Sequence, residues 1–210
     1  MALARVREHV NPLSGKYKTP STAPDWEGVY ADFSKPLHLD IGCARGKFLM
    51  EMADRFPDWN YLGLEIREPL VIQANEYRDE MNLGNLHFLF CNANNSLRPL
   101  LESLPAEILK RVSIQFPDPW FKKRHQKRRV VQPPLVRDLA DLMPSGSELF
   151  IQSDVLDVAV EMRDRFQAAP EFAITSPAWL DPNPMPIPTE RELATLKYND
   201  PVYRSLFHKR

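Results

Sequence analysis

The sequence lacks the features that mark several classes of protein. Its longest uninterrupted run of apolar residues is four, from Phe88 to Cys91, whereas a membrane-spanning helix needs about 20. The two cysteines are too few for a disulfide framework or a zinc cluster. The N-terminal residues MALARVREHV contain no apolar stretch typical of a secretory signal. We therefore expect a cytoplasmic protein with no membrane contact and no metal.

The sequence has few glycines and almost no net charge. The 210 residues include 7 glycines against 20 prolines, so each glycine is expected where the backbone needs its freedom. The formal net charge is −1, which argues against a polyanionic partner unless the charges are segregated. They are segregated, because the segment from Lys122 to Arg129 carries +6 and the rest of the chain −7.

The apolar pattern alternates between short strands and helices of about ten residues. The expected strands span residues 37–41, 59–65, 86–91, 112–116, 148–153, 172–175 and 203–207. The expected helices span residues 46–56, 69–81, 97–109, 134–143 and 154–167, with Asp154 as the cap of the last. Residues 1–35 are expected to form an irregular N-terminal arm, and residues 36–210 a single domain. This alternation predicts an α/β fold with a mainly parallel sheet, which binds ligands beyond the carboxyl ends of its strands.

Acidic and glycine residues gather where the first two expected strands end. Asp40, Gly42 and Gly46 belong to the first strand end, and Glu65 to the second. A glycine turn lets a ligand approach the backbone, and a carboxylate after the second strand can accept both ribose hydroxyls of a nucleoside. The pyrophosphate-binding pattern G-x-G-x-x-G is missing, and an acid at this turn repels phosphate but attracts a sulfonium or an amine. The cation S-adenosylmethionine (SAM) is therefore favoured as the cofactor.

Asn92, after the third expected strand, has two interpretations. Its side chain can hydrogen-bond the adenine edge of the cofactor, or it can shape a turn that is rich in asparagine. The spacing alone leaves both open. Cys43 and Cys91 are expected to be small buried apolar residues rather than nucleophiles.

The most specific segment, FPDPWFKKRHQKRR, follows the fourth expected strand. Two prolines hold Asp118 in extended geometry, and Trp120 and Phe121 offer flat faces on which a base can stack. The basic residues follow directly. Cations and aromatic rings at the ligand edge of the sheet suit phosphate contacts beside a reacting base, so a nucleic acid is the expected partner.

Taken together, DIGCARG, Glu65, FPDPWFKKRHQKRR, Asp154 and the late TERE segment resemble the TrmB-type tRNA (guanine-N7)-methyltransferases. The resemblance covers about residues 36–210. It implies a Rossmann-like class I methyltransferase fold, with a seven-stranded sheet and helices on both faces. It also implies SAM-dependent methylation of guanine N7 in the variable loop of tRNA. In two places the sequence departs from the family pattern: Ala44 stands where many members have glycine, and Arg191 where many have a bulky apolar residue.

The resemblance also implies roles for individual residues. The cofactor-binding positions are Asp40, Gly42, Gly46, Glu65, Asn92 and Asp118. The substrate-binding positions are Lys122, Asp154, Thr189 and Glu192. The RNA-contacting positions are Arg124, His125, Gln126, Lys127, Arg128 and Arg129. The expected catalytic residue is Asp118, which would accept hydrogen bonds from the guanine or from the SAM amine, with Asp154 taking the other role. Trp120 is a candidate surface for stacking the turned-out guanine.

Three other functions compete with this one. An amino-methyltransferase would place an Asn/Asp-Pro-Pro-aromatic loop at the same strand end, but the order here is Pro-Asp-Pro-Trp. An RNA-binding module without catalysis is disfavoured by the intact acids, and a nicotinamide dehydrogenase by the missing pyrophosphate pattern. The sequence leaves open whether the protein is a monomer or a homodimer.

Overall fold

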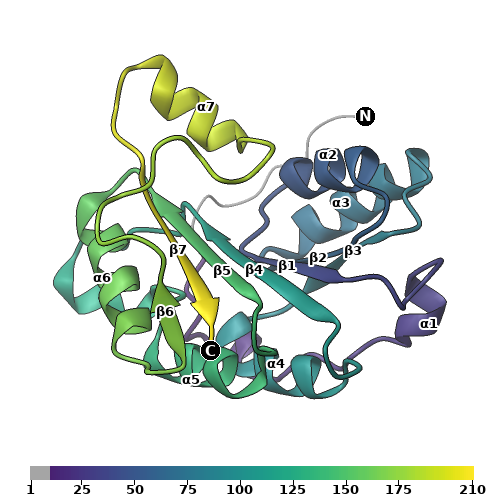
Figure 1. Cartoon of the computed structure of the whole chain (residues 1–210). Coiled ribbons are helices and arrows are strands. Elements are labelled where there is room, and N and C mark those ends of the chain that lie inside the picture. Colours follow the sequence, from purple (N-terminus) through teal and green to yellow (C-terminus); the bar gives the residue numbers. More distant parts are fainter. Residues whose placement is uncertain (1–9) are drawn as a thin grey trace.

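Seven strands form one sheet, and helices cover both of its faces (Figure 1). The computed structural model describes residues 10–210. The strand order is β3-β2-β1-β4-β5-β7-β6; β1 to β5 pair in parallel, and β7 runs antiparallel to β5 and β6. The strands are β1 (Leu37–Ile41), β2 (Asn60–Glu65), β3 (Leu86–Phe90), β4 (Leu109–Gln115), β5 (Glu148–Ser153), β6 (Phe172–Ile174) and β7 (Tyr203–Lys209). The predicted α/β fold, with a mainly parallel seven-stranded sheet, is confirmed.

Two apolar clusters hold the helices to the sheet. One cluster joins α2 and α3 to β2 and β3, around Leu49 and Phe88, and the other joins α4, α5 and α6 to β1, β4 and β5, around Leu97 and Leu139. The helices are α1 (Trp26–Val29), α2 (Lys47–Arg55), α3 (Glu68–Glu80), α4 (Ala93–Glu102), α5 (Pro133–Leu142), α6 (Leu156–Gln167) and α7 (Glu190–Lys197), with 3-10 turns η1 (Gly15–Tyr17) and η2 (Lys123–Arg128). None of these helices in residues 10–210 is long and apolar enough to cross a membrane.

The strand order reverses between β1 and β4, and this reversal positions the site. In the register of the sheet, Asp40 of β1 lies beside Gly63 of β2 and Ser113 of β4. The loops after β1, β2, β4 and β5 therefore begin at one edge of the sheet. Such a switch point is where open α/β sheets bind their ligands.

Two predictions about helix boundaries are wrong. The helix expected over residues 97–109 is α4, Ala93–Glu102. It begins early because the Asn92 side chain caps it by accepting from Asn94 N, and it ends early because Leu109 pairs with Leu37 in the sheet. Asp154 does not cap α6, because the N-cap is Val155 and the Asp154 carboxylate accepts from Arg191 of α7.

One helix, α7, was not expected from the apolar pattern. Its N-cap is Thr189, whose hydroxyl accepts from Glu192 N at 3.1 Å. The sequence T-E-R-E is the pattern of a capping box. The capping-box pattern at Thr189 and Glu192 therefore indicates the start of this helix, although the apolar periodicity does not.

The N-terminal arm packs on the sheet, and residues 1–9 of it lie outside the described residues. Trp26 and Tyr30 are buried and stacked on each other, and the Tyr30 hydroxyl donates to Tyr61 O at 3.1 Å. The Ser21 hydroxyl donates to Phe90 O at 2.9 Å. These contacts bring the arm to the carboxyl end of β3.

Candidate active site

The loop between β1 and α2 is built for close approach to the backbone. Gly42, Ala44 and Gly46 all have positive φ, at 88°, 51° and 75°. A Cβ at Gly46 would lie 2.3 Å from the ring of Phe88, so only glycine fits there. A Cβ at Gly42 would meet no atom within 4 Å, which leaves open space on that side of the loop.

Asp40 is a buried carboxylate at the end of β1. The Ser113 hydroxyl donates to its Oδ1 at 2.6 Å and Gln115 Nε2 at 3.2 Å. Burial raises the pKa of Asp40 to about 6, against the lowering effect of these two hydrogen bonds, and the Glu65 carboxylate raises it further. Both hydrogen bonds reach Oδ1, so Oδ2 is the oxygen that can accept from a cofactor amine.

Glu65 ties the β1 loop to the end of β2. Its Oε2 accepts from Ala44 N at 3.0 Å, and its two oxygens accept from Arg67 Nε and Nη2, both at 2.9 Å. Burial lowers the pKa of Arg67, but the Glu65 carboxylate and the nearby charge of Asp118 raise it, and they prevail. Arg67 therefore binds Glu65 and lies within electrostatic reach of Asp118.

These features fit SAM. The open space above Gly42 leaves room for a ligand against the backbone, and a buried carboxylate offers Asp40 Oδ2 to a cation. Glu65 holds the loop and can exchange its Arg67 contacts for ribose hydroxyls. The chemistry of this donor set therefore suits a nucleoside with a positive charge rather than a pyrophosphate.

Asn92 takes the second of its two interpretations in this structure. Its Oδ1 accepts from Asn94 N at 3.2 Å, while its Nδ2 donates to Pro12 O at 3.1 Å and Tyr17 O at 3.3 Å. The side-chain amide thus caps α4 and holds the N-terminal arm. Both Nδ2 hydrogens are engaged, so a contact to adenine would use the second lone pair of Oδ1.

The Pro-Asp-Pro segment is bracketed by unusual backbone. Phe116 and Trp120, on either side of it, have positive φ at 48° and 42°. Non-glycine residues in this region store strain, which collects at functional sites. Phe116 N donates to Gln152 O at 2.8 Å, so the segment begins fixed to β5. Asp118 is partly buried and lies close enough to Arg67 to affect its pKa.

The basic segment divides into an exposed and a buried part. The exposed cations are Lys122, Lys123, Arg124 and Lys127. The guanidinium of Arg128 lies 4.9 Å from the centre of the Trp120 ring, and His125 packs against the same ring edge-on. Arg129 is only 6% exposed and turned inward. Of the two aromatic residues, Phe121 is the one that is free to stack a base, at 73% exposure, because Arg128 lies against Trp120.

Three of the four predicted substrate residues, Asp154, Thr189 and Glu192, meet around α7, whereas Lys122 lies at the start of the basic segment. Asp154 accepts from Arg191 Nε at 2.8 Å, so the residue that departs from the family pattern has a partner inside this group. Glu192 is 1% exposed and accepts from Arg204 Nη2 at 2.7 Å and from Asn183 Nδ2 at 2.7 Å. Its carboxylate is thus committed to a buried ion pair in this structure.

Sequence reasoning missed a chain of buried and half-buried polar residues that joins these two regions. Gln152 Nε2 donates to Gln115 Oε1 at 2.8 Å and to Glu192 Oε2 at 3.3 Å, and Gln115 also donates to Asp40. The signal was a glutamine near the end of each of two strands whose other inner residues are apolar or small. Buried amides need partners, so Gln115 and Gln152 mark this edge as polar. Cys43 and Cys91 are buried, and burial raises the pKa of each thiol, for Cys91 to about 12, as expected of non-nucleophilic residues.

Known proteins resemble the chain over nearly its whole length. The family model described as "Putative methyltransferase" matches residues 34–205. The tRNA (guanine-N(7)-)-methyltransferase of Synechococcus elongatus is 62% identical over 207 residues, which cover 99% of this chain and 97% of that protein. The protein of the same name from Trichormus variabilis is 59% identical over 210 residues, which cover 100% of this chain and 98% of that protein.

A solved structure supports the fold separately. The 16S rRNA methyltransferase KamB has a TM-score of 0.59 and 15% identity, covering 90% of this chain and 96% of that chain. At that identity the likeness concerns the fold alone. The full-length identities of 59% and 62% carry the stronger conclusion. The chain belongs to the family of tRNA (guanine-N(7)-)-methyltransferases.

Proposed function

We propose that this protein transfers the methyl group of SAM to N7 of a guanine in the variable loop of tRNA. One observation carries the proposal: Asp118 stands in a strained loop close enough to Arg67, the partner of Glu65, to affect its pKa, and an exposed basic segment begins four residues later. When bound, SAM supplies a methyl group on a sulfonium, which is electrophilic without further activation. The residues described next then serve to bind and orient the two reactants.

On the cofactor side, Asp40 would accept from the SAM amine and Glu65 from the ribose hydroxyls. Gly42 and Gly46 let the backbone come close to the ligand, and Asn92 shapes the turn beside the adenine. Guanine N7 already carries a lone pair, so the reaction needs no general base. Catalysis is therefore a matter of position and electrostatics.

Asp118 is the proposed catalytic residue. Its carboxylate accepts from N1–H and the amino group of the guanine, which holds the base, and it favours the positive charge that grows on the purine during transfer. The fixed backbone from Phe116 to Trp120 keeps the carboxylate aimed while the base enters. Phe121 offers its exposed ring to the turned-out base.

The rest of the substrate lies on the basic segment and on α7. Lys122, Arg124 and Lys127 contact phosphates, with His125, Gln126 and Arg128 behind them. Asp154, Thr189 and Glu192 shape the wall around the guanine. Arg129 is buried, so we leave it out of the direct RNA contacts. All residues of the proposed site come from one chain, so either a monomer or each subunit of a homodimer could be active. Because the proposed substrate is tRNA, we expect the protein to act in the cytoplasm.

The test is transfer of labelled methyl from SAM to bulk tRNA by wild-type protein, followed by borohydride and aniline scission at N7-methylguanine. Asp118→Ala is expected to cut turnover by ~10² or more, as for other losses of oriented electrostatics. The dissociation constant for tRNA is expected to stay within about twofold, because the cations that bind phosphates remain.

The matched control is Asp157→Ala, an exposed acid at the start of α6. It removes the same charge from the same side of the protein, and turnover is expected to be unchanged. Normal turnover in Asp118→Ala would remove this residue from the mechanism. Tight binding of tRNA and SAM by the wild type without methyl transfer would point to the non-catalytic RNA-binding module instead.

A further inference from the structure

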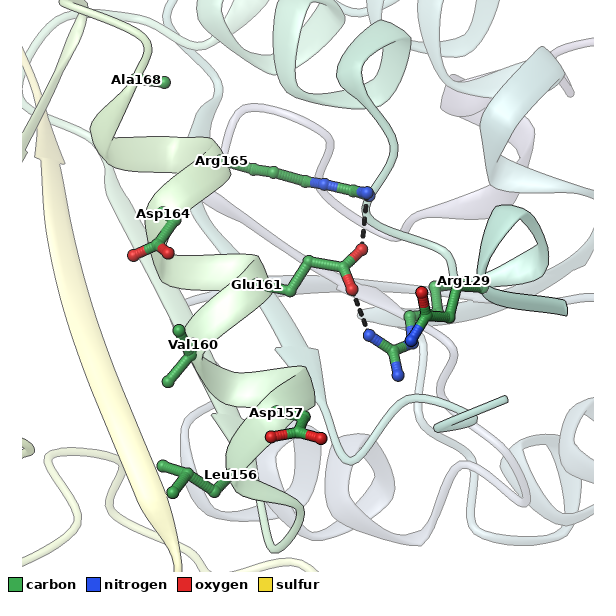
Figure 2. Close-up of a pocket in the computed structure, with 9 residues that line it drawn as sticks. Arg129, Leu156, Asp157, Val160, Glu161, Asp164, Arg165 and Ala168 are labelled. Carbon is green, nitrogen blue, oxygen red and sulfur yellow. Dashed lines mark hydrogen bonds and ion pairs between the residues drawn. The ribbon is translucent and has the colours of Figure 1, made fainter. Parts of the chain in front are cut away.

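Glu161 lies on α6 between two arginines, on the wall of an open hollow of about 620 Å³ (Figure 2). Its Oε1 pairs with Arg165 Nη2 at 2.6 Å and its Oε2 with Arg129 Nη1. The lining residues come from α6 and the basic segment, and none comes from the loops after β1 and β2. Glu161 therefore belongs to neither the cofactor acids nor the residues around α7.

The two arginines carry the effect of Glu161 to both ends of the basic segment. Arg129 Nε donates to Pro119 O at 2.7 Å, which fixes the loop that holds Asp118. Arg165 Nη1 donates to Val131 O, just after the segment ends. One carboxylate thus orients two cations, and each cation holds one end of the stretch from residue 119 to residue 131.

Because Arg129 is buried, its inward position depends on the Glu161 carboxylate. The side chain of Arg129 is 7% exposed and that of Glu161 24%. A guanidinium in such surroundings needs a charged partner and hydrogen bonds to offset its loss of hydration. Without Glu161, the Arg129 guanidinium would regain hydration by turning out to water. Pro119 O would then lose its hydrogen-bond donor.

We propose that Glu161 is a positioning residue for tRNA binding, and that it acts through Arg129 and Arg165 on the shape of the basic segment. The inference rests on the proposed tRNA substrate. The arrangement explains why a segment of six cations keeps its last arginine inward. The buried arginine does not touch RNA but sets the loop from which the exposed cations project.

The direction in which one substitution changes tRNA affinity distinguishes a positioning role from a purely electrostatic one. Glu161→Gln removes a negative charge near a surface for a polyanion, so electrostatics alone would tighten tRNA binding. Loss of positioning would weaken it. Asp164→Asn is the matched control, because Asp164 lines the same hollow on the same helix but is exposed.

With Glu161→Gln the KM for tRNA is expected to rise roughly tenfold, the loss of about one charge-assisted contact. The Kd for SAM is expected to be unchanged, and kcat is expected to fall less than the KM rises, because Phe116 N still fixes the loop of Asp118 to β5. Asp164→Asn is expected to leave the KM equal or slightly lower. Glu161→Asp keeps the charge but is one methylene too short to span both arginines, so its KM is expected to rise as well. This variant also serves if Glu161→Gln folds poorly.

A double substitution tests whether the effect passes through Arg129. Arg129→Gln with Glu161→Gln is expected to lose less tRNA affinity than the two single losses added together, because part of the effect of Glu161 passes through Arg129 and the rest through Arg165. Additive losses would overturn the proposal, as would a lower KM in Glu161→Gln. If wild-type protein itself fails to methylate tRNA, the proposed function fails, whereas normal wild-type activity with an unchanged KM in Glu161→Gln refutes only the positioning role.

Discussion

At the scale of single residues, Asp40 shows how the sheet prepares a site for a cation. It is buried at the end of β1, and burial raises its pKa to about 6. The Asp40 carboxyl group therefore holds its proton more tightly in the folded protein than in the unfolded chain. Its contribution makes the folded protein less stable as pH rises from about 4 to about 6. A bound positive charge would reverse that penalty, so the residue trades stability for affinity.

The affinity for SAM should therefore depend on pH. If SAM binds the ionised carboxylate, its Kd at pH 5 is expected to be about tenfold weaker than at pH 7.5, since the group is largely protonated one unit below its pKa. Isothermal titration calorimetry across this range measures it. Asp40→Asn should bind more weakly at pH 7.5 and show no such dependence. A wild-type Kd that stays constant from pH 5 to pH 7.5 would exclude Asp40 as the partner of the cation.

At the scale of elements, α7 stands beyond the edge at which the parallel strands end (Figure 1). Three ion pairs hold it, and two of them lie at opposite extremes of burial. Glu192 and Arg204 form the buried one, with side chains 2% and 5% exposed, while Lys47 and Glu190 form an exposed one, at 58% and 61%. The two pairs are expected to differ greatly in energy, since removing one partner of a buried pair leaves an uncompensated charge.

Glu192→Gln is accordingly expected to lower the free energy of unfolding by about 3 kcal/mol, against less than about 1 kcal/mol for Lys47→Gln. Urea denaturation measures both. The same variants decide the role of Glu192, because the family resemblance makes it a substrate-binding residue and the structure gives it an ion pair. Unchanged stability with lost turnover in Glu192→Gln would favour direct contact with substrate.

Features of the fold and the site could be predicted from sequence where residues close together in the chain specify them. Most strands were predictable because short apolar runs between turn residues specify them directly, but β4 begins at Leu109, three residues before its expected start. The extent of α4 was not, because it depends on Leu109 pairing with Leu37 across the sheet. At the site, Asp40 and Glu65 were placed by their positions at strand ends. The inward turn of Arg129 was hidden because its partner Glu161 lies 32 residues away along the chain.

At the scale of the whole molecule, the net charge of −1 is the sum of a basic segment and an acidic body. The structure sharpens this division, since only part of the segment faces solvent. Arg128 lies on Trp120 and Arg129 on Glu161, whereas Lys123, Arg124 and Lys127 are exposed. Salt dependence of tRNA binding should therefore follow the exposed cations and not the total number of basic residues.

Changing Lys122, Arg124 and Lys127 together to glutamine is expected to flatten the slope of log K against log salt by about two to three, since each phosphate contact contributes roughly 0.7 to 0.9. Filter binding at several salt concentrations measures the slope. The matched control changes Lys35, Arg55 and Lys110, which lie near the amino-terminal ends of the strands, and should leave it unaltered. Arg129→Gln should weaken binding at every salt concentration while the slope stays within about one of the wild type. Equal slopes for the wild type and the exposed triple variant would mean that the segment faces away from the RNA backbone.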